Sequence, residues 1–241
     1  MSGATTLAGT PNPEAPNPQL PVVQKLRIRY AKRGRLRFTS HRDFARAFER
    51  AVRRSRLPIG FSSGFSPHPK ISYANAAPTG SASEAEFLEI GLTESLQPDD
   101  VRAALDAALP PGLDVLDVVV AEPGSLAERL EASEWRIELP GADPAQLDIA
   151  ASAFLAADEI AVDRMTKRGL RSIDVRGAVV ALAAEGGTVR AVVRTTVPTV
   201  RPDDIVVGLR ENGLAWLGTP IAQRLEQGPL TGAEVGDPLR H

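Results

Sequence analysis

The stretch from residue 59 to residue 70, IGFSSGFSPHPK, combines residue types that bind anions in loops. Gly60 and Gly64 let backbone amides approach an anion closely. The candidate ligands are hydroxyl, imidazole and ammonium groups, from Ser62, Ser63, Ser66, His68 and Lys70. Phe61 and Phe65 could stack on unpaired RNA bases or could pack in the core, where aromatic side chains mostly lie. The loop therefore indicates either an anion site or a simple turn of the chain.

A basic helix precedes this loop, and we expect it over residues 41–55. Ser40 with Asp43 predicts the N-terminal cap. Apolar residues recur at helical spacing from Phe44 to Val52, which predicts a buried stripe. The opposite face carries a row of cations: Arg42, Arg46, Arg50, Arg53 and Arg54. We expect Arg35 and Arg37, on a predicted strand just before the helix, to join this row in binding phosphates.

The charge of the chain is unevenly distributed. Residues 25–70 contain fourteen lysines and arginines but only Asp43 and Glu49 as acids, whereas the formal net charge of the whole chain is −2. Such asymmetry predicts a face that binds a polyanion, RNA above all. The alternative is a charged face that is merely solvated.

A second cationic cluster follows much later in the chain. It spans residues 164–176 and consists of Arg164, Lys167, Arg168, Arg171 and Arg176. Gly169 marks a turn, so residues 167–171 are expected at the tip of a hairpin, where they could bind phosphates or simply keep the turn soluble.

The sequence favours binding over catalysis. His41 and His68 could act as a general acid and base on an RNA phosphodiester. No spacing of metal ligands, phosphate-binding loop or nucleophile elbow accompanies them. We therefore expect a non-enzymatic protein without a metal or cofactor, and keep the two histidines as weak catalytic candidates.

The order of predicted elements indicates an α+β fold. Strand–helix–strand–strand–helix–strand over residues 22–122 predicts a basic ferredoxin-like domain, and residues 123–217 predict a second α+β domain that loosely repeats it. Residues 1–21 are expected to be a disordered tail and residues 218–241 a flexible one. There is no cysteine, signal peptide or apolar run of about 20 residues, so we expect a cytoplasmic protein without membrane contact.

Several motifs resemble those of the radical-SAM-linked protein family, a domain of unknown function found alone or joined to a radical-SAM enzyme. They are Lys25 to Tyr30, Ser40 to Phe44, Gly64 to Ile71, Lys167 to Gly169 and Asp174 to Arg176. The resemblance covers roughly residues 22–212. It implies a radical-SAM partner and a role in RNA modification or processing. Without cysteines the chain cannot hold the iron–sulfur cluster of such an enzyme.

Together these features predict an accessory protein that binds RNA, tRNA or rRNA being the expected class, through the basic helix and the loop. Two alternatives remain open. One is an RNA-processing or RNA-modifying enzyme that uses His41 and His68. The other is a protein-interaction module that docks on a radical-SAM partner.

Overall fold

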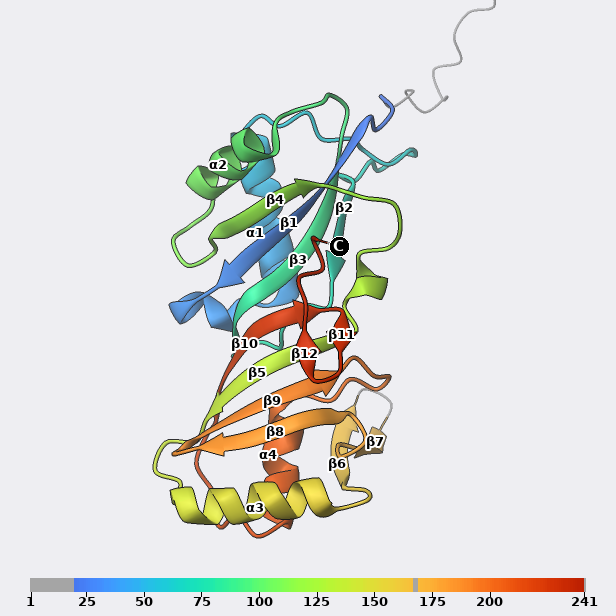
Figure 1. Cartoon of the computed structure of the whole chain (residues 1–241). Coiled ribbons are helices and arrows are strands. Elements are labelled where there is room, and N and C mark those ends of the chain that lie inside the picture. The colour runs from blue at the N-terminus through green and yellow to red at the C-terminus, as the bar shows by residue number, and fades with distance from the viewer. Residues whose placement is uncertain (1–19, 167–168, 241) are drawn as a thin grey trace, which may run out of the picture.

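The computed structural model of the chain describes residues 20–166 and 169–240. It has an α+β fold in which a large mixed sheet carries four α-helices among the described residues, so the α+β prediction is confirmed (Figure 1). All but the last two residues of the predicted tail 1–21 lie outside the described part. None of the described helices has the length and apolar character needed to cross a membrane.

The first half of the chain alternates strands and helices. Its elements are β1 (Gln24–Lys32), the short 3₁₀ helix η1 (Gly34–Phe38), α1 (His41–Arg54), β2 (Ile71–Ala74), β3 (Ala82–Leu92), α2 (Pro98–Ala108) and β4 (Val115–Val120). The N-terminus of α1 is capped as predicted, since the Ser40 hydroxyl accepts a hydrogen bond from the Asp43 amide at 3.2 Å. Phe44 and Phe48 are buried on its inner face, which confirms the predicted stripe.

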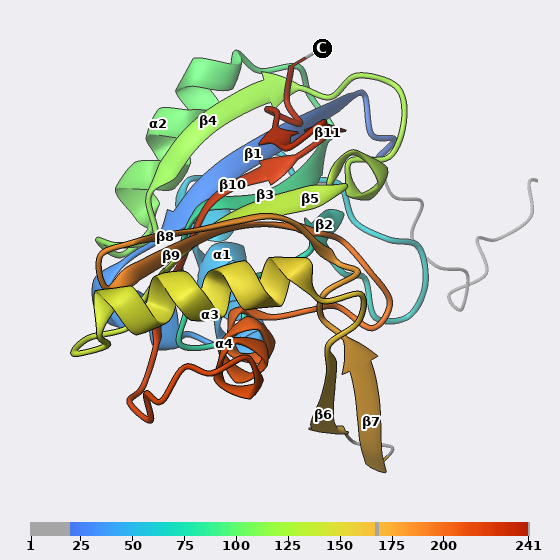
Figure 2. The ribbon, with the colours of Figure 1, turned by 60° about the horizontal axis from the view of Figure 1, so that its bottom comes forward.

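The second half contains more strands. Its elements are η2 (Ala127–Arg129), β5 (Ala132–Glu138), α3 (Pro144–Ala156), β6 (Ala161–Thr166), β7 (Gly169–Asp174), β8 (Val179–Glu185), β9 (Thr188–Arg194), α4 (Pro202–Glu211), β10 (Ile221–Gly228), β11 (Leu230–Thr231) and β12 (Glu234–Val235). β6 and β7 form a separate hairpin that projects from the sheet (Figure 2). The N-terminus of α3 is capped by Asp143, whose carboxylate accepts a hydrogen bond from the Ala145 amide at 2.8 Å.

One continuous sheet joins the two halves. Its strand order is β4-β1-β3-β10-β5-β9-β8, with β2 paired to β3 off this path. β10 runs antiparallel to β5 over seven register pairs and parallel to β3 over two, Gln223 with Ala82 and Arg224 with Ser83. β10 therefore stands between the halves and pairs with both.

The helices lie on one face of this sheet. Leu88 and Ile90 of β3 belong to the core of α1 and α2, while Trp135 and Ile137 of β5 belong to the core of α3 and α4. On the other face, Phe87 of β3 packs in a smaller cluster with residues from η2 and the C-terminal segment. Figure 1 shows β11 and β12 in front of the sheet and α1 behind it.

The C-terminal prediction is wrong for the described residues. Residues 218–240 are not a flexible tail, because 221–228 form β10 in the middle of the sheet. Buried positions of β10 are occupied by Arg224 and Gln227 rather than by large apolar residues. The strand therefore lacks the alternating apolar pattern by which strands are recognised.

Two shorter segments also differ from expectation. Residues 35–38 were expected in a strand but lie in η1, because Gly34 adopts a φ of +54° and turns the chain out of β1. Residues 214–217, the end of the predicted second domain, form no strand, and their side chains Leu214 and Trp216 pack in the core beside α4. The predicted domain boundary between residues 122 and 123 stays a prediction.

Replacing Gly228 tests the position of the C-terminal segment. A methyl group at Gly228 would overlap the carbonyl oxygen of Gly236, whereas one at Gly236 would meet nothing nearer than 3.7 Å. We expect Gly228→Ala to lower the free energy of unfolding by about 1–3 kcal/mol, as overpacking does, and Gly236→Ala to change it by less than about 0.5 kcal/mol. Urea denaturation followed by circular dichroism measures both. Equal stability of the two variants would contradict the placement of β10 beside residues 229–236.

Candidate nucleic-acid interface

The outer face of α1 presents a row of arginines to solvent. Arg42, Arg46, Arg50 and Arg53 are all exposed, while the opposite side of the helix is buried against β1 and β3. Residues four apart on a helix lie one above the other, about 6 Å along its axis. Arg53 also pairs with Glu49 at 3.4 Å, an exposed contact that leaves most of its guanidinium accessible. The structure thus brings these predicted residues onto one surface.

Arg54 has a structural role. Its Nη1 donates to the carbonyl oxygen of Ala108 at 3.0 Å and so binds the C-terminal end of α2. Last-turn carbonyls of a helix lack partners within the helix, so this contact ties α1 to α2. Although Arg54 is exposed, it contributes less to the free cationic surface than its neighbours on α1.

The arginines of η1 lie at the approach to α1. Arg35 is exposed. Arg37 is half-buried, with its guanidinium over the Phe38 ring at 4.8 Å from the centroid, and its Nε has no hydrogen-bond partner among the described residues. The aromatic contact holds the Arg37 guanidinium beside an exposed ring.

Two arginines of β1, and Arg33 directly after the strand, are neutralised by acids from distant parts of the chain. Arg27, only 1 % exposed, pairs with Glu89 and donates to two carbonyl oxygens near residue 123. Arg29 pairs with Glu226, and Arg33 with Glu84 and Asp114. The local charge excess counted along the sequence is therefore smaller in space, and what remains exposed is concentrated on η1, α1 and the loop that follows.

The loop over residues 60–70 is closed at its base by backbone hydrogen bonds. The Gly60 amide donates to Gly91 O at 2.7 Å, and the Lys70 amide donates to Gly60 O at 2.8 Å. Inside this closure the Ser62 amide donates to His68 O at 2.8 Å, and the Ser62 hydroxyl accepts from the His68 amide at 3.0 Å. Ser62 thus stabilises the loop rather than pointing freely to a ligand.

The tip of the loop presents Phe65 and two hydroxyls to solvent. Phe65 is 92 % exposed, so it does not pack in the core, and Ser63 and Ser66 are exposed beside it. Gly64 has a φ of +125°, a conformation that favours glycine at the turn. An aromatic ring held outward on a closed loop is available for stacking.

Phe61 lies deeper than Phe65. It is 36 % exposed and lines a groove of about 300 Å³ between the loop and α1, together with His68, Glu49 and Arg53. A second hollow of about 360 Å³ on the other side of the loop is lined by Ser62, His68 and Lys70. The structure therefore brings His68 close to both the arginine row and Lys70.

The two candidate catalytic histidines are not brought together. His68 lies by residues 49–53 of α1, whereas His41 is the first residue of that helix and contacts the edge of the Tyr73 ring at 5.0 Å. At about 1.5 Å per residue, His41 and Glu49 are roughly 12 Å apart along the helix axis. Direct acid–base cooperation of the two side chains requires a shorter separation.

Tyr73 is a half-buried neighbour of His41 that the sequence did not single out. Its hydroxyl has no hydrogen-bond partner among the described residues. Burial, and then the negative charge of Glu49, raise the pKa of Tyr73 far above its usual range. The hydroxyl therefore stays protonated at neutral pH.

The second cationic cluster is separated from α1. Arg171 is exposed on β7, but Arg176 donates to the carbonyl oxygens of Leu155 and Val179 and thereby binds the end of α3. The hairpin is fixed to α4 by Arg164, whose Nη1 lies 2.6 Å from the Asp204 carboxylate. Lys167 and Arg168 lie outside the described residues. Figures 1 and 2 both place the hairpin beside the second half, away from α1.

The sequence reasoning missed a group of residues at the junction of the halves. Trp135, Arg224 and Gln227 line a cavity on the helix face of the sheet. The signal in the sequence is a strand-length segment that contains Arg224 and Gln227. The structure shows that both side chains are buried. That signal is weak until the pairing of β10 is known.

Comparison with models of protein families gives a match over most of the chain. The family model described as "Uncharacterized protein conserved in bacteria (DUF2344)" matches residues 25–202. The search of curated proteins found no match. The matched range includes η1, α1 and the loop over residues 60–70, and it ends at the first residue of α4.

Proposed function

The chain belongs to the family of uncharacterized proteins conserved in bacteria (DUF2344), and we propose that it binds RNA through the surface formed by η1, α1 and the loop over residues 60–70. The observation that carries the proposal is the exposed arginine row of α1 beside a closed loop with an outward aromatic ring. The expected RNA is a tRNA or an rRNA. The protein acts as an accessory that holds it.

The arginine row suits a phosphate backbone. A guanidinium is planar, permanently charged and able to donate two parallel hydrogen bonds to a phosphate. The row lies on a rigid helix whose inner face is fully packed, so little ordering is needed on binding. Such contacts position a nucleic acid without reading its sequence.

The loop offers groups that can contact RNA bases, which the arginine row of the helix does not. Phe65 offers a flat apolar face for an unpaired base, and the exposed hydroxyls of Ser63 and Ser66 offer hydrogen bonds. His68 and Lys70 stand at the base of the loop, next to the arginine row. Single-stranded segments of a folded RNA combine exposed phosphates with unstacked bases, which is the chemistry that this pair of elements fits.

The separation of His41 and His68 favours binding over paired acid–base catalysis. The enzymatic alternative would need either histidine to act with a group of the RNA or of a partner. RNA binding by the arginine row requires no such additional group.

We also infer that both halves are ferredoxin-like. The support is the strand order, β4-β1-β3-β2 in the first half and β10-β5-β9-β8 in the second, with the β6–β7 hairpin as an insertion. β1 and β3 lie at the centre of the first half, and β5 and β9 lie at the centre of the second. An experimental structure with another strand order would contradict this interpretation.

The resemblance to the radical-SAM-linked family leads us to propose a radical-SAM enzyme as partner, in the cytoplasm. We expect such an enzyme to co-purify with the tagged protein from its native host and to be released by nuclease treatment, because the RNA bridges the two. Mass spectrometry of the eluates measures this. An enzyme that stays bound after nuclease treatment would indicate direct protein docking, and its absence from both eluates would contradict the partnership.

Neutralising the arginine row tests RNA binding. We expect Arg46, Arg50 and Arg53, all changed to Gln, to weaken binding of labelled tRNA. Each lost phosphate contact on a single-stranded segment reduces the magnitude of the negative slope of log affinity against log salt by about 0.7, so the triple variant should reduce this magnitude by about 2. Fluorescence anisotropy over a salt series measures the slope.

The matched control removes the same charge elsewhere. Arg136, Arg190 and Arg240 changed to Gln lose exposed ion pairs of the kind that contributes little to stability. This control should keep the wild-type affinity and slope. If both triple variants weaken binding equally, the interaction depends on overall charge, and the α1 surface is not the site.

Phe65 tests the role of the loop. We expect Phe65→Ala to weaken binding of a single-stranded RNA oligonucleotide by about 1–3 kcal/mol, the usual contribution of one stacked base, and Phe65→Tyr to preserve it. Because the side chain is exposed, the free energy of unfolding should change by less than about 0.5 kcal/mol. Equal affinities of wild type and Phe65→Ala would remove base stacking from the proposal.

A further inference from the structure

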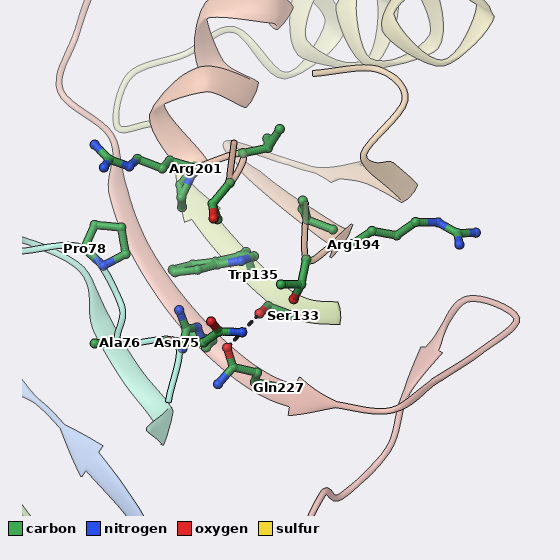
Figure 3. Close-up of a pocket in the computed structure, with 14 residues that line it drawn as sticks. Asn75, Ala76, Pro78, Ser133, Trp135, Arg194, Arg201 and Gln227 are labelled. Atoms are coloured by element: carbon green, nitrogen blue, oxygen red, sulfur yellow. Dashed lines mark hydrogen bonds between the residues drawn. The ribbon is translucent and has the colours of Figure 1, made fainter. Parts of the chain in front are cut away.

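A cavity of about 210 Å³ opens between the two halves on the helix face of the sheet (Figure 3). Its sheet side is formed by Ser133 and Trp135 of β5 and by Arg224 and Gln227 of β10. The segment after β2, residues 75–78, borders it on one side, and residues 193–202 border it on the other. It is thus a separate site from the outer face of α1.

Arg224 is a buried cation in the lining of this cavity. It is 4 % exposed, and its Nη1 donates to the Asn75 carbonyl oxygen at 2.7 Å and to the Glu86 carboxylate at 3.3 Å. Its Nε has no hydrogen-bond partner among the described residues. A guanidinium has five N–H donors, so these contacts leave donors for a further acceptor.

Among the described residues, the buried positive charge beside the cavity exceeds the buried negative charge that acts on it. Lys32 is buried next to the same segment and donates to the carbonyl oxygens of Ala77 and Pro78. Among the described residues, Glu86 is the one carboxylate whose charge acts on both Lys32 and Arg224. Two buried cations therefore share one buried anion, an arrangement that is costly unless another negative group joins them.

The pKa values agree with this imbalance. Burial lowers the pKa of Arg224 and of Lys32, because removal from water disfavours the charged forms, although the charge of Glu86 opposes the effect. Burial, and then Glu86, raise the pKa of Tyr30, so its hydroxyl stays neutral and adds no negative charge.

The rim adds positive charge and the wall adds a flat ring. Arg194 and Arg201 are exposed lining residues, and Figure 3 shows both guanidinium groups extending outward from the cavity. None of the described lining residues is acidic. Trp135 lies near the centre of the view, with the Arg224 guanidinium 4.9 Å from its ring centroid.

We propose that this cavity binds a small ligand made of one flat ring and one anionic group. The anion, a carboxylate or a phosphate, lies near Arg224, and the exposed side chain of Arg194 or Arg201 turns inward from the rim to meet it. The ring lies against Trp135, and Gln227 and Ser133 offer hydrogen bonds to its polar edge. Pockets for drug-sized ligands measure about 300–1,000 Å³, so the smaller volume fits a single ring.

Tryptophan fluorescence tests the proposal directly. The chain has two tryptophans, and Trp216→Phe leaves Trp135 as the only one. In this background we expect benzoate and uridine monophosphate to change the emission saturably at millimolar concentration or below. Their uncharged counterparts, benzamide and uridine, should bind at least tenfold more weakly. Inorganic phosphate alone should also bind more weakly, because it lacks the ring.

Variants identify the cavity as the site. Arg201→Gln should weaken the binding of both charged probes severalfold. Arg136→Gln changes an exposed arginine of β5 that does not line the cavity, and it should leave binding unchanged. Removing the buried pair with Arg224→Met and Glu86→Gln together should abolish binding. Circular dichroism checks the fold of this double variant. If the double variant does not fold, Arg201→Gln still tests whether the probes bind in the cavity.

Three outcomes would overturn the proposal. One is the absence of saturable binding by either charged probe, and another is equal affinity for charged and uncharged probes. The third is binding that neither Arg201→Gln nor the double variant affects. The α1 triple variant should bind the probes normally, so a failure of RNA binding would not affect this site.

Discussion

The pairing of β10 with both β3 and β5 is the contact on which the architecture depends. It makes one sheet out of two halves that otherwise have separate helical cores. The parallel contact with β3 is short, and it is reinforced where the Arg224 guanidinium reaches Glu86 of β3 and lies over Trp135 of β5. The junction is therefore polar and buried, unlike the apolar cores on either side, and the cavity between the halves is a consequence of it.

Local sequence rules predicted the elements that depend on local interactions. The cap at Ser40 and the apolar stripe from Phe44 lie where they were expected. Partners distant in sequence could not be predicted. β10 was missed because its buried positions hold Arg224 and Gln227, whose burial is possible only when Glu86 and Ser133 face them. A strand stabilised by such partners has no pattern of its own.

The candidate interface was predicted only in part, again because partners distant in sequence could not be predicted. Counting charges along the chain located an exposed basic surface but overstated its charge, because Glu84, Glu89 and Glu226 neutralise Arg33 and two arginines of β1 from far away. The arginines of α1 stay exposed, and their helical spacing predicted this solvent face. The outward position of Phe65 was undecided in the sequence, since a phenylalanine after a glycine fits either a core or a loop tip.

The place of β10 in the chain has a consequence for how the protein is made. Every other strand of the sheet precedes it, so during synthesis the edges of β3 and β5 that β10 will cover have no partner until residue 228 has left the ribosome. Uncovered strand edges can pair with other chains. β2 protects part of the β3 edge, at residues 87–90, and leaves residues 82 and 83 to β10. The two halves can thus acquire their helical cores early, whereas the sheet is completed only near the end of translation.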